Sequence, residues 1–411
     1  MRWVAAAILL AGCKGNPQPI TEPHVGSAAA ATSPVKPNHV EGETLRPHQE
    51  QPVVECLAKV PDNADDDTHV QALLDQANRD IERGNYGAAW TCADRAADMA
   101  PTSVEAHHLR GASLAALNRD SEAQLAYSLA LALDPDDPET LRAVADFYIN
   151  GKGERGRDAL RLGLELAQRG SRRALARRRR NVQLAADLAV LEAQALNDLG
   201  RSDEALERVD SALKIAPNRG DALHERGVAL FDLSRFADAK VAFQKALGTQ
   251  PQDAYTHQML GLTLEQLGDN GADAELRRAM ELAPKELSAP VLIPVAEFQK
   301  EIDAVVGSLP ADRKAHVKNI KVEIADLPDP LDLKAVQPPF PPTILGLYRG
   351  PVGRAPAPGD EAPSIVLYRK NLARAVKSRT ELSEQIRDTL LHEIGHLEGL
   401  DEDDLRRRGM E

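Results

Sequence analysis

The chain has 411 residues, a formal net charge of −13 at pH 7 and an aromatic content of only 3%. This length allows more than one folded domain. The acidic balance and the scarcity of aromatic side chains argue against a nucleic-acid-binding protein, because proteins of that class use clustered Lys and Arg for the phosphates and aromatic rings for stacking on bases.

The N-terminus predicts export followed by membrane attachment. Arg2 precedes an apolar run, Val4–Ala11, that is too short to span a bilayer, so we expect residues 1–12 to be a signal peptide. The run leads into Leu10-Ala11-Gly12-Cys13, which resembles the bacterial lipobox. The resemblance implies that Cys13 is acylated and anchors the mature protein in a membrane of the bacterial cell envelope, exposed to the periplasm or the cell surface. The alternative is an ordinary secretory signal with an incidental cysteine.

The segment that follows, residues 13–67, is rich in proline, alanine and polar residues, a composition typical of a disordered tether. Cys56 and Cys92 are the two cysteines that remain once Cys13 is acylated. In an oxidising envelope they would form one disulfide and hold the end of the tether to the first folded helices. The alternative is a pair of small unpaired hydrophobic residues, and the sequence does not choose between the two.

Residues 68–285 repeat with a period of about 34 residues. Pro101 and Pro135 are 34 residues apart, as are Pro217 and Pro251. Small residues recur at positions where helices pack: Gly111, Gly227, Gly261, Ala96, Ala130, Ala212, Ala246 and Ala279. The pattern resembles tetratricopeptide repeats, which implies an α-helical superhelix of about six helical pairs, one of them degenerate. Such a stack curves into a concave surface that binds a protein or peptide partner.

One interval, Pro138–Ala185, departs from this period and carries two groups of arginines, Arg172–Arg173 and Arg177–Arg180. Two interpretations remain for these arginines. They form a solvated helix face, or they bind anionic partners such as lipid headgroups.

Near the C-terminus, His392-Glu393-Ile394-Gly395-His396 has HExxH spacing. On a helix, His392 and His396 point from one face, so both imidazoles can bind one metal ion. Zinc held by three protein ligands and a water lowers the pKa of that water to about 7, and Glu393 would accept its proton during attack on a carbonyl carbon. The pattern therefore predicts zinc-dependent hydrolysis of peptide bonds. The alternative is a buried helix whose histidines are satisfied by other groups.

The residues around the motif predict a small α+β domain over residues 286–411. Ser378 and Glu381 form a capping box that starts a long helix, and apolar residues follow at helical spacing through the motif: Leu382, Ile386, Leu390 and Leu397. Strands are expected at 321–324 and 364–368. We consider 364–368 an edge strand, which either binds an extended substrate over the zinc by strand addition or is an ordinary sheet edge.

Two tyrosines near the motif have two possible roles. Either Tyr348 or Tyr368 steadies a developing oxyanion, or both rings simply pack with a satisfied hydroxyl.

The region from about Val322 to Gly409 is similar to small zincin-like metallopeptidases, which have an HExxHxxGxx(D/E) signature. The similarity includes three segments, Leu345–Gly350, Ser364–Arg369 and Thr389–His392. It also includes the spacing of the motif, from His392 to Glu402 with Gly399 between them. The resemblance implies that His392, His396 and Glu402 hold zinc, with Glu393 as the base. Asp401 remains a rival to Glu402 as the third ligand.

These observations together predict a membrane-anchored envelope zinc metallopeptidase whose repeats recruit protein substrates or partners. One alternative is a tetratricopeptide scaffold lipoprotein with an inactive or structural zinc domain. A second is a zinc amidase acting on cell-wall peptides, because the motif fits any amide carbonyl.

Overall fold

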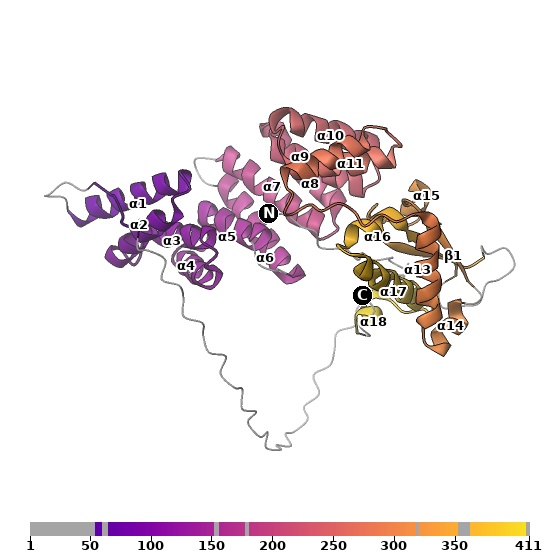
Figure 1. Ribbon diagram of the computed structural model, residues 1–411. Coiled ribbons are helices and arrows are strands. Elements are labelled where there is room, and N and C mark those ends of the chain that lie inside the picture. Colours follow the sequence, from indigo (N-terminus) through magenta and orange to yellow (C-terminus); the bar gives the residue numbers. More distant parts are fainter. Residues whose placement is uncertain are drawn as a thin grey trace, which may run out of the picture.

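The computed structural model describes residues 54–59, 65–151, 156–176, 181–317, 320–351 and 362–407. The predicted signal peptide, Cys13, most of the tether and Arg177–Arg180 lie outside these ranges. Within them, no helix is both long and apolar enough to cross a membrane. The chain forms a curved helical array that leads into a smaller domain built around a sheet (Figure 1).

The array consists of six helical pairs in the described residues, as the repeat pattern predicts. The pairs are α1 (Asp66–Glu82) with α2 (Tyr86–Met99), α3 (Val104–Ala116) with α4 (Asp120–Leu133), α5 (Pro138–Asn150) with α6 (Arg157–Ala176), α7 (Val182–Asp198) with α8 (Ser202–Ile215), α9 (Gly220–Asp232) with α10 (Phe236–Thr249), and α11 (Ala254–Gln266) with α12 (Ala272–Leu282).

Local chemistry explains why the pairs recur. Asp137 and Asp253 are N-cap residues whose carboxylates accept the backbone N–H three residues later, which satisfies a donor that the helix leaves unpaired. Between paired helices the chain passes through the left-handed region, at Gly84 (φ 75°), Gly200 (φ 76°) and Gly268 (φ 65°). Glycine adopts this conformation without steric cost, so the turn follows from the sequence.

The small residues of the period let paired helices approach closely. A Cβ at Gly111 would lie 2.6 Å from the ring of Tyr127, and one at Gly261 would lie 2.7 Å from Leu276 Cγ. The recurring alanines are at most 1% exposed. Any larger side chain at these positions would overpack the contact between two helices.

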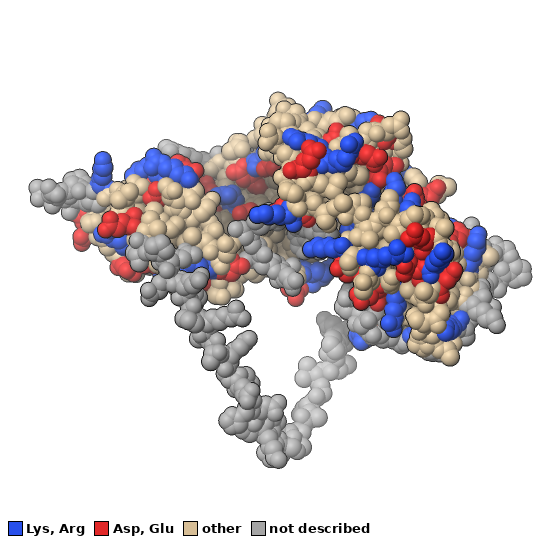
Figure 2. Space-filling view, in the orientation of Figure 1, with Lys and Arg blue, Asp and Glu red and all other residues tan. Residues whose placement is uncertain are grey.

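The irregular third pair contains part of the arginine-rich interval. Arg169 and Arg173 of α6 both pair with Asp136, each at 2.8 Å. Arg173 therefore has a partner within the array, although its side chain is half exposed. Figure 2 shows Lys and Arg interspersed with Asp and Glu on the face in view, without a broad area of one sign.

The N-terminal end of the array carries a covalent link. Cys56 and Cys92 form a disulfide, which is one of the two alternatives that the sequence left open. The segment 54–59 lies against α2, and the Thr91 hydroxyl donates a hydrogen bond to the carbonyl of Val54 at 2.8 Å. The disulfide and this hydrogen bond together hold the segment on the second helix of the first pair.

The C-terminal domain contains a three-stranded sheet of order β1-β3-β2. Its strands are β1 (Lys321–Ala325), β2 (Gly346–Arg349) and β3 (Ser364–Tyr368), with β1 parallel and β2 antiparallel to β3. The helices are α13 (Val295–Ser308), α14 (Ala311–Val317), α15 (Pro330–Leu333), α16 (Arg369–Ala375), α17 (Arg379–Leu397) and α18 (Glu402–Arg407).

The strand order corrects one expectation. The strands at 321–324 and 364–368 are present, but the prediction that Ser364–Tyr368 is an edge strand was wrong. β3 pairs on both sides and all five of its residues are buried, so it cannot take up an added strand. Strand β2, which periodicity did not predict, lies at the edge instead. It has only four residues, too few to show an alternation of their own.

The two faces of this sheet pack against different parts of the chain. Ile365 and Leu367 of β3 join the apolar cluster of α13 and α17, whereas Val366 and Tyr368 join a second cluster. That second cluster includes residues of the array, from α9, α10 and α11: Leu230, Phe231, Phe236, Phe243, Leu260 and Leu264. The sheet therefore lies between the helix that carries the HExxH motif and the last repeats, an arrangement that can be followed in Figure 1.

An ion-pair cluster joins the same two regions. Glu265 at the end of α11 binds Lys370 Nζ at 3.0 Å and also binds the guanidinium of Arg374, both on α16. The Glu265 side chain is only 6% exposed. A carboxylate this buried needs its charge partners, so the contact specifies how the domain docks on the array.

Candidate metal centre and repeat groove

Helix α17 begins and ends as its sequence dictates. Ser378 Oγ accepts the N–H of Glu381 at 3.2 Å, and the Glu381 carboxylate reaches back to the N–H of Lys377 at 2.8 Å. Of the apolar stripe predicted along this helix, Leu382, Ile386 and Leu390 are 0% exposed and Leu397 is partly buried. The packing of that stripe against the sheet fixes the rotation of the helix about its axis and therefore the direction of the HExxH side chains.

The end of α17 brings a carbonyl oxygen to one of the histidines. Gly399 has a φ of 85°, the N–H of Gly399 donates to the carbonyl of His396, and the N–H of Leu400 donates to that of Gly395. These bonds form a Schellman motif, which reverses the chain directly after the motif. As a result, the carbonyl oxygen of Leu400 lies 3.1 Å from His396 Nδ1.

The two imidazoles of the motif meet with their Nε2 atoms facing each other. His392 Nε2 and His396 Nε2 are 3.1 Å apart, and both side chains are buried. A carbonyl oxygen can only accept, so His396 Nδ1 carries the proton and its Nε2 presents a lone pair. Two nitrogens bound to a tetrahedral zinc at normal bond lengths lie about 3.3 Å apart. The donor spacing and the backbone hydrogen bond on the far nitrogen both fit a metal site.

The carboxylate of Glu393 is fixed by the neighbouring strand. Its Oε2 accepts the backbone N–H of Tyr348 in β2 at 2.7 Å, and the side chain is 5% exposed. Charged hydrogen bonds of this kind are stronger than those between neutral groups. The carboxylate thus has one oxygen held by the sheet, on the helix that carries the two histidines.

The candidate third ligands lie just beyond the helix. Asp401 is exposed, and its Oδ1 accepts the N–H of Asp404 at 2.8 Å, which caps α18. Glu402 is the first residue of α18, and its side chain lies outside what the structure describes. Among the described side chains, no His, Cys, Asp or Glu completes a group of three with His392 and His396. Glu402 and Asp401 therefore both stay predictions.

The two tyrosines have partners of their own. The Tyr348 hydroxyl donates to the carbonyl of Pro351 at 3.1 Å, and the Tyr368 hydroxyl faces Asp332 at 3.5 Å. Burial raises the pKa of both phenols, so neither ionises near neutral pH. Tyr368 also packs in the cluster shared with the array, on the face of the sheet away from α17. These contacts agree with the packing role.

Sequence reasoning missed two features near the motif. One is the Tyr348 N–H that binds Glu393. The other is an ion pair between Arg313 of α14 and Glu398, the C-cap residue of α17, at 2.7 Å and with both side chains mostly buried. The two partners are 85 residues apart in the chain, so no local pattern signals them.

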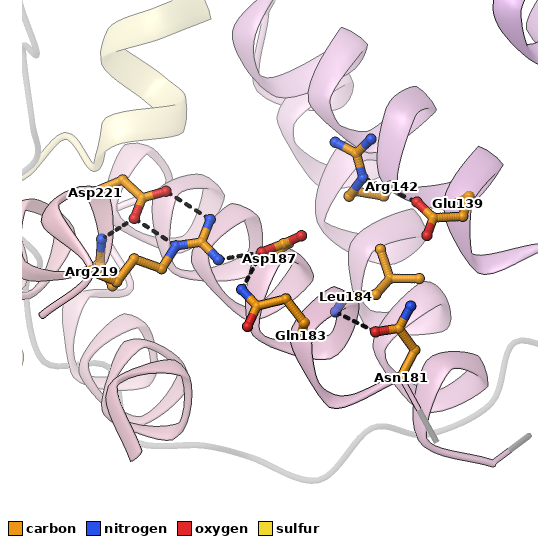
Figure 3. A network of polar contacts seen from close by, with 9 residues as sticks. Glu139, Arg142, Asn181, Gln183, Leu184, Asp187, Arg219 and Asp221 are labelled. Atoms are coloured by element: carbon orange, nitrogen blue, oxygen red, sulfur yellow. Dashed lines mark hydrogen bonds and ion pairs between the residues drawn. The ribbon is translucent and has the colours of Figure 1, made fainter. Parts of the chain in front are cut away.

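The second candidate site is a groove along the array, of about 440 Å³. It is lined by residues of α5, α7, α9 and α11 together with inter-helix loops. Acidic side chains outnumber basic ones along it. The lining contains two arginines, Arg142 and Arg219, and five acidic residues, Asp146, Asp187, Asp221, Glu225 and Asp253. Figure 3 shows Arg219 held between Asp187 and Asp221. These hydrogen bonds raise the pKa of Arg219, which keeps it charged. The groove is therefore polar, structured and predominantly acidic.

Comparisons with known proteins agree with this division of the chain. Residues 317–410 match the family model of zincin-like metallopeptidases. A search of curated protein sequences found no match. The family match falls on the C-terminal domain, and the helical array before it consists of stacked helical pairs.

Several solved structures are similar to part of this chain. The pilF protein of Pseudomonas aeruginosa is 16% identical over 57% of this chain and 99% of its own, with a TM-score of 0.46. PilW, a type IV pilus biogenesis factor, is 16% identical over 53% and 94%, with a TM-score of 0.45. A tetratricopeptide protein of Thermus thermophilus is 20% identical over 47% and 98%, with a TM-score of 0.39. These similarities concern the fold alone.

Proposed function

We propose that this protein is a zinc metallopeptidase of the bacterial envelope that hydrolyses peptide bonds in proteins brought to it by its repeats. The observation that carries the proposal is the pair of buried Nε2 atoms 3.1 Å apart, with the carboxylate of Glu393 on the same helix. His392, His396 and an acid, either Glu402 or Asp401, would hold the zinc. The family match over residues 317–410 supports the same chemistry.

In this proposal each residue of the site has a separate chemical role. A zinc ion bound here would supply a Lewis acid and lower the pKa of its water. The bond from His396 Nδ1 to Leu400 fixes the tautomer that leaves Nε2 as a ligand. Glu393 would accept a proton from water and pass it to the leaving amine. Burial of all three side chains strengthens each of these electrostatic interactions.

The remaining parts of the proposal concern recruitment and anchoring. The groove of about 440 Å³, with its excess of carboxylates, suits a polar and cationic stretch of a protein partner. Acylation of Cys13 would hold the protein at a membrane, and residues 13–67 would let it reach substrates away from the lipid surface.

The test combines zinc content with cleavage of a mixed peptide library, using protein that lacks residues 1–13. We expect stoichiometric zinc and cleavage in the wild type, and zinc without cleavage in Glu393→Gln, because the amide keeps the shape of the carboxylate but cannot take a proton. His396→Ala should lose the metal. Cleavage retained in Glu393→Gln would refute the mechanism, and zinc with no cleavage in either protein would favour the scaffold alternative.

A matched pair of variants assigns the third ligand. Asp401→Ala and Glu402→Ala should differ in zinc affinity by at least about tenfold, because loss of one of three ligands weakens the site far more than loss of a helix cap. We expect Glu402→Ala to have the larger effect, since the Asp401 carboxylate already binds the N–H of Asp404. Unchanged zinc affinity in Glu402→Ala would assign the role to Asp401.

A further inference from the structure

Strand β2 presents a backbone donor to the catalytic helix rather than to its neighbouring strand. Tyr348 lies opposite Ile365 in the antiparallel pair, and the pair formed by Leu345 and Tyr368 is hydrogen-bonded. Hydrogen-bonded and non-hydrogen-bonded pairs alternate along such a ladder, so the N–H of Tyr348 points away from β3. Its partner is Glu393 Oε2, at 2.7 Å.

The close approach of β2 to α17 depends on Gly346, a residue without a side chain. A Cβ at Gly346 would lie 2.7 Å from Thr389 Cγ2, and 3.3 Å from both Cγ and Oε1 of Glu393. Thr389 and Glu393 are one turn apart on the same face of α17. Glycine at 346 therefore allows the strand to lie directly on the part of the helix that carries the motif, which brings the N–H of Tyr348 within reach of the carboxylate.

The strand is fixed by contacts that do not involve Glu393. Arg349 Nε donates to Asp332 Oδ1 at 3.1 Å, and the ladder with β3 holds the backbone. Leu347, on the opposite face, packs in the cluster that includes array residues of α9, α10 and α11. The N–H of Tyr348 is thus a preorganised donor, positioned by the sheet and by the array before any substrate binds.

We infer that β2 is the positioning element for the catalytic base: the N–H of Tyr348 orients Glu393 through Oε2, and Gly346 sets the approach of the strand. This inference rests on the proposed function, since it assigns Glu393 as the base. It also limits strand addition at this edge, because an added peptide would compete with Glu393 for the Tyr348 N–H.

The first test removes the N–H and puts the proline Cδ in its place. Tyr348→Pro abolishes the donor, and proline is tolerated at a sheet edge where the N–H points outward. Tyr348→Val keeps the N–H and loses the same ring, so it serves as the reference. We expect kcat about 10- to 100-fold lower in Tyr348→Pro than in Tyr348→Val, with KM and zinc content alike, because displacement of a catalytic group by about 1 Å costs this much. Equal kcat in the two variants, or a higher kcat in the proline variant, would overturn the inference.

The second test changes the spacing and leaves the N–H in place. Gly346→Ala should lower kcat about tenfold at unchanged zinc content, because the new methyl group pushes β2 from Thr389 and Glu393. The double variant Gly346→Ala with Thr389→Ser, which removes Thr389 Cγ2, should recover part of that loss. Full activity in Gly346→Ala would contradict the role given to the strand spacing.

A third measurement does not depend on activity. Hydrogen exchange of the Tyr348 amide should be faster in Glu393→Ala than in the wild type, while the Leu347 amide of the same strand should not change. A wild type that neither binds zinc nor cleaves peptides would refute the proposed function even if this exchange effect were observed. A zinc-dependent wild type with no exchange effect would refute only the positioning role.

Discussion

The repeat array and the C-terminal domain are built in opposite ways. In the array each helix packs on its neighbours in the sequence, and the same turns and small residues recur, so that stability is close to a sum over adjacent pairs. In the C-terminal domain the sheet joins strands 43 residues apart, Lys321 to Ser364, and one face of it is covered by the array. We therefore expect the array to be modular and the domain with the HExxH motif to depend on the array for its fold.

The largest expected effect comes from cutting the chain between the two regions. Residues 286–411 alone would expose Leu347, Val366 and Tyr368, which are each less than 10% exposed in the intact chain. Exposure of this much apolar surface costs several kcal/mol at about 25 cal/mol per Å², comparable to the whole stability of a small domain. We expect no cooperative thermal unfolding of this fragment by calorimetry.

The reciprocal fragment is the control for that experiment. Residues 54–285 retain their own apolar clusters in the first four pairs and should keep a cooperative helical transition by circular dichroism. A cooperative transition in the isolated 286–411 fragment would mean that the two regions are independent after all.

A smaller and more local effect is expected at the far end of the array. Cys56→Ser breaks the disulfide that spans 36 residues of sequence, and cross-links of this kind contribute about 2–4 kcal/mol. Because repeats couple chiefly to their neighbours, hydrogen exchange should accelerate in α1 and α2 and stay unchanged in α17. Faster exchange throughout the chain would show that the array unfolds as one unit.

Loss of the ion-pair contact between α11 and α16 should lower the free energy of unfolding by about 1–2 kcal/mol. Glu265→Gln leaves Lys370 and Arg374 without their buried carboxylate, and a lost partner of this kind costs more than a surface pair is worth. Denaturant unfolding measures the loss. The matched control is Glu281→Gln, which breaks an exposed pair with Arg278 on α12 and should change the stability by less than about 0.5 kcal/mol. Equal effects would mean that the Glu265 contact does not secure the interface.

The smallest expected effect is a pH dependence inside the array. Burial, with the neighbouring charges of Asp198 and Glu225, raises the pKa of Asp232 to about 7. An unfolded aspartate titrates near about 3.9, so the native state retains a proton that the unfolded state releases as the pH rises between these values. The contribution of Asp232 to stability is therefore highest below about pH 4 and falls up to about pH 7.

Asp232→Asn tests this titration. The amide still accepts the hydrogen bond that the Ser202 hydroxyl gives to Asp232 Oδ2 at 3.0 Å, but it has no charge to bury. At about pH 8 the variant should be more stable than the wild type by on the order of 1 kcal/mol, and at about pH 4 the two should agree. A stability difference that does not change with pH would show that Asp232 does not titrate in this range.

The contrast between the two regions also explains what could be predicted from the sequence. The six helical pairs follow from local signals such as Gly84, Gly200 and Gly268, and the start of α17 follows from Ser378 and Glu381. The end of α17 follows likewise from Gly399, whose φ of 85° is a conformation that glycine adopts readily. Each of these features is decided by a few neighbouring residues, so a sequence pattern is enough.

The features that escaped prediction are decided by contacts distant in sequence. Residues Gly346–Arg349 form a strand because they pair with β3 and pack against α17. A segment of four residues is too short for its own sequence to indicate these contacts. The edge position of β3 was wrongly predicted for the same reason, since strand order depends on all three strands together. The donor to Glu393 is a backbone N–H, and every residue except proline has one, so the sequence does not indicate which backbone N–H binds Glu393.

The docking of α9, α10 and α11 on the sheet has a further consequence for how this chain can vary in length. Additional repeat units of about 34 residues inserted near α3 would extend the array at its free end and leave the docked pairs where they are. The groove between α5 and α11 would then keep a constant offset from His392 and His396. A polypeptide bound in that groove would reach the histidines only with the part of its chain that lies a fixed distance from the bound segment. Under the proposed peptidase function, the site of cleavage would then depend on how far a peptide bond lies from the segment bound in the groove.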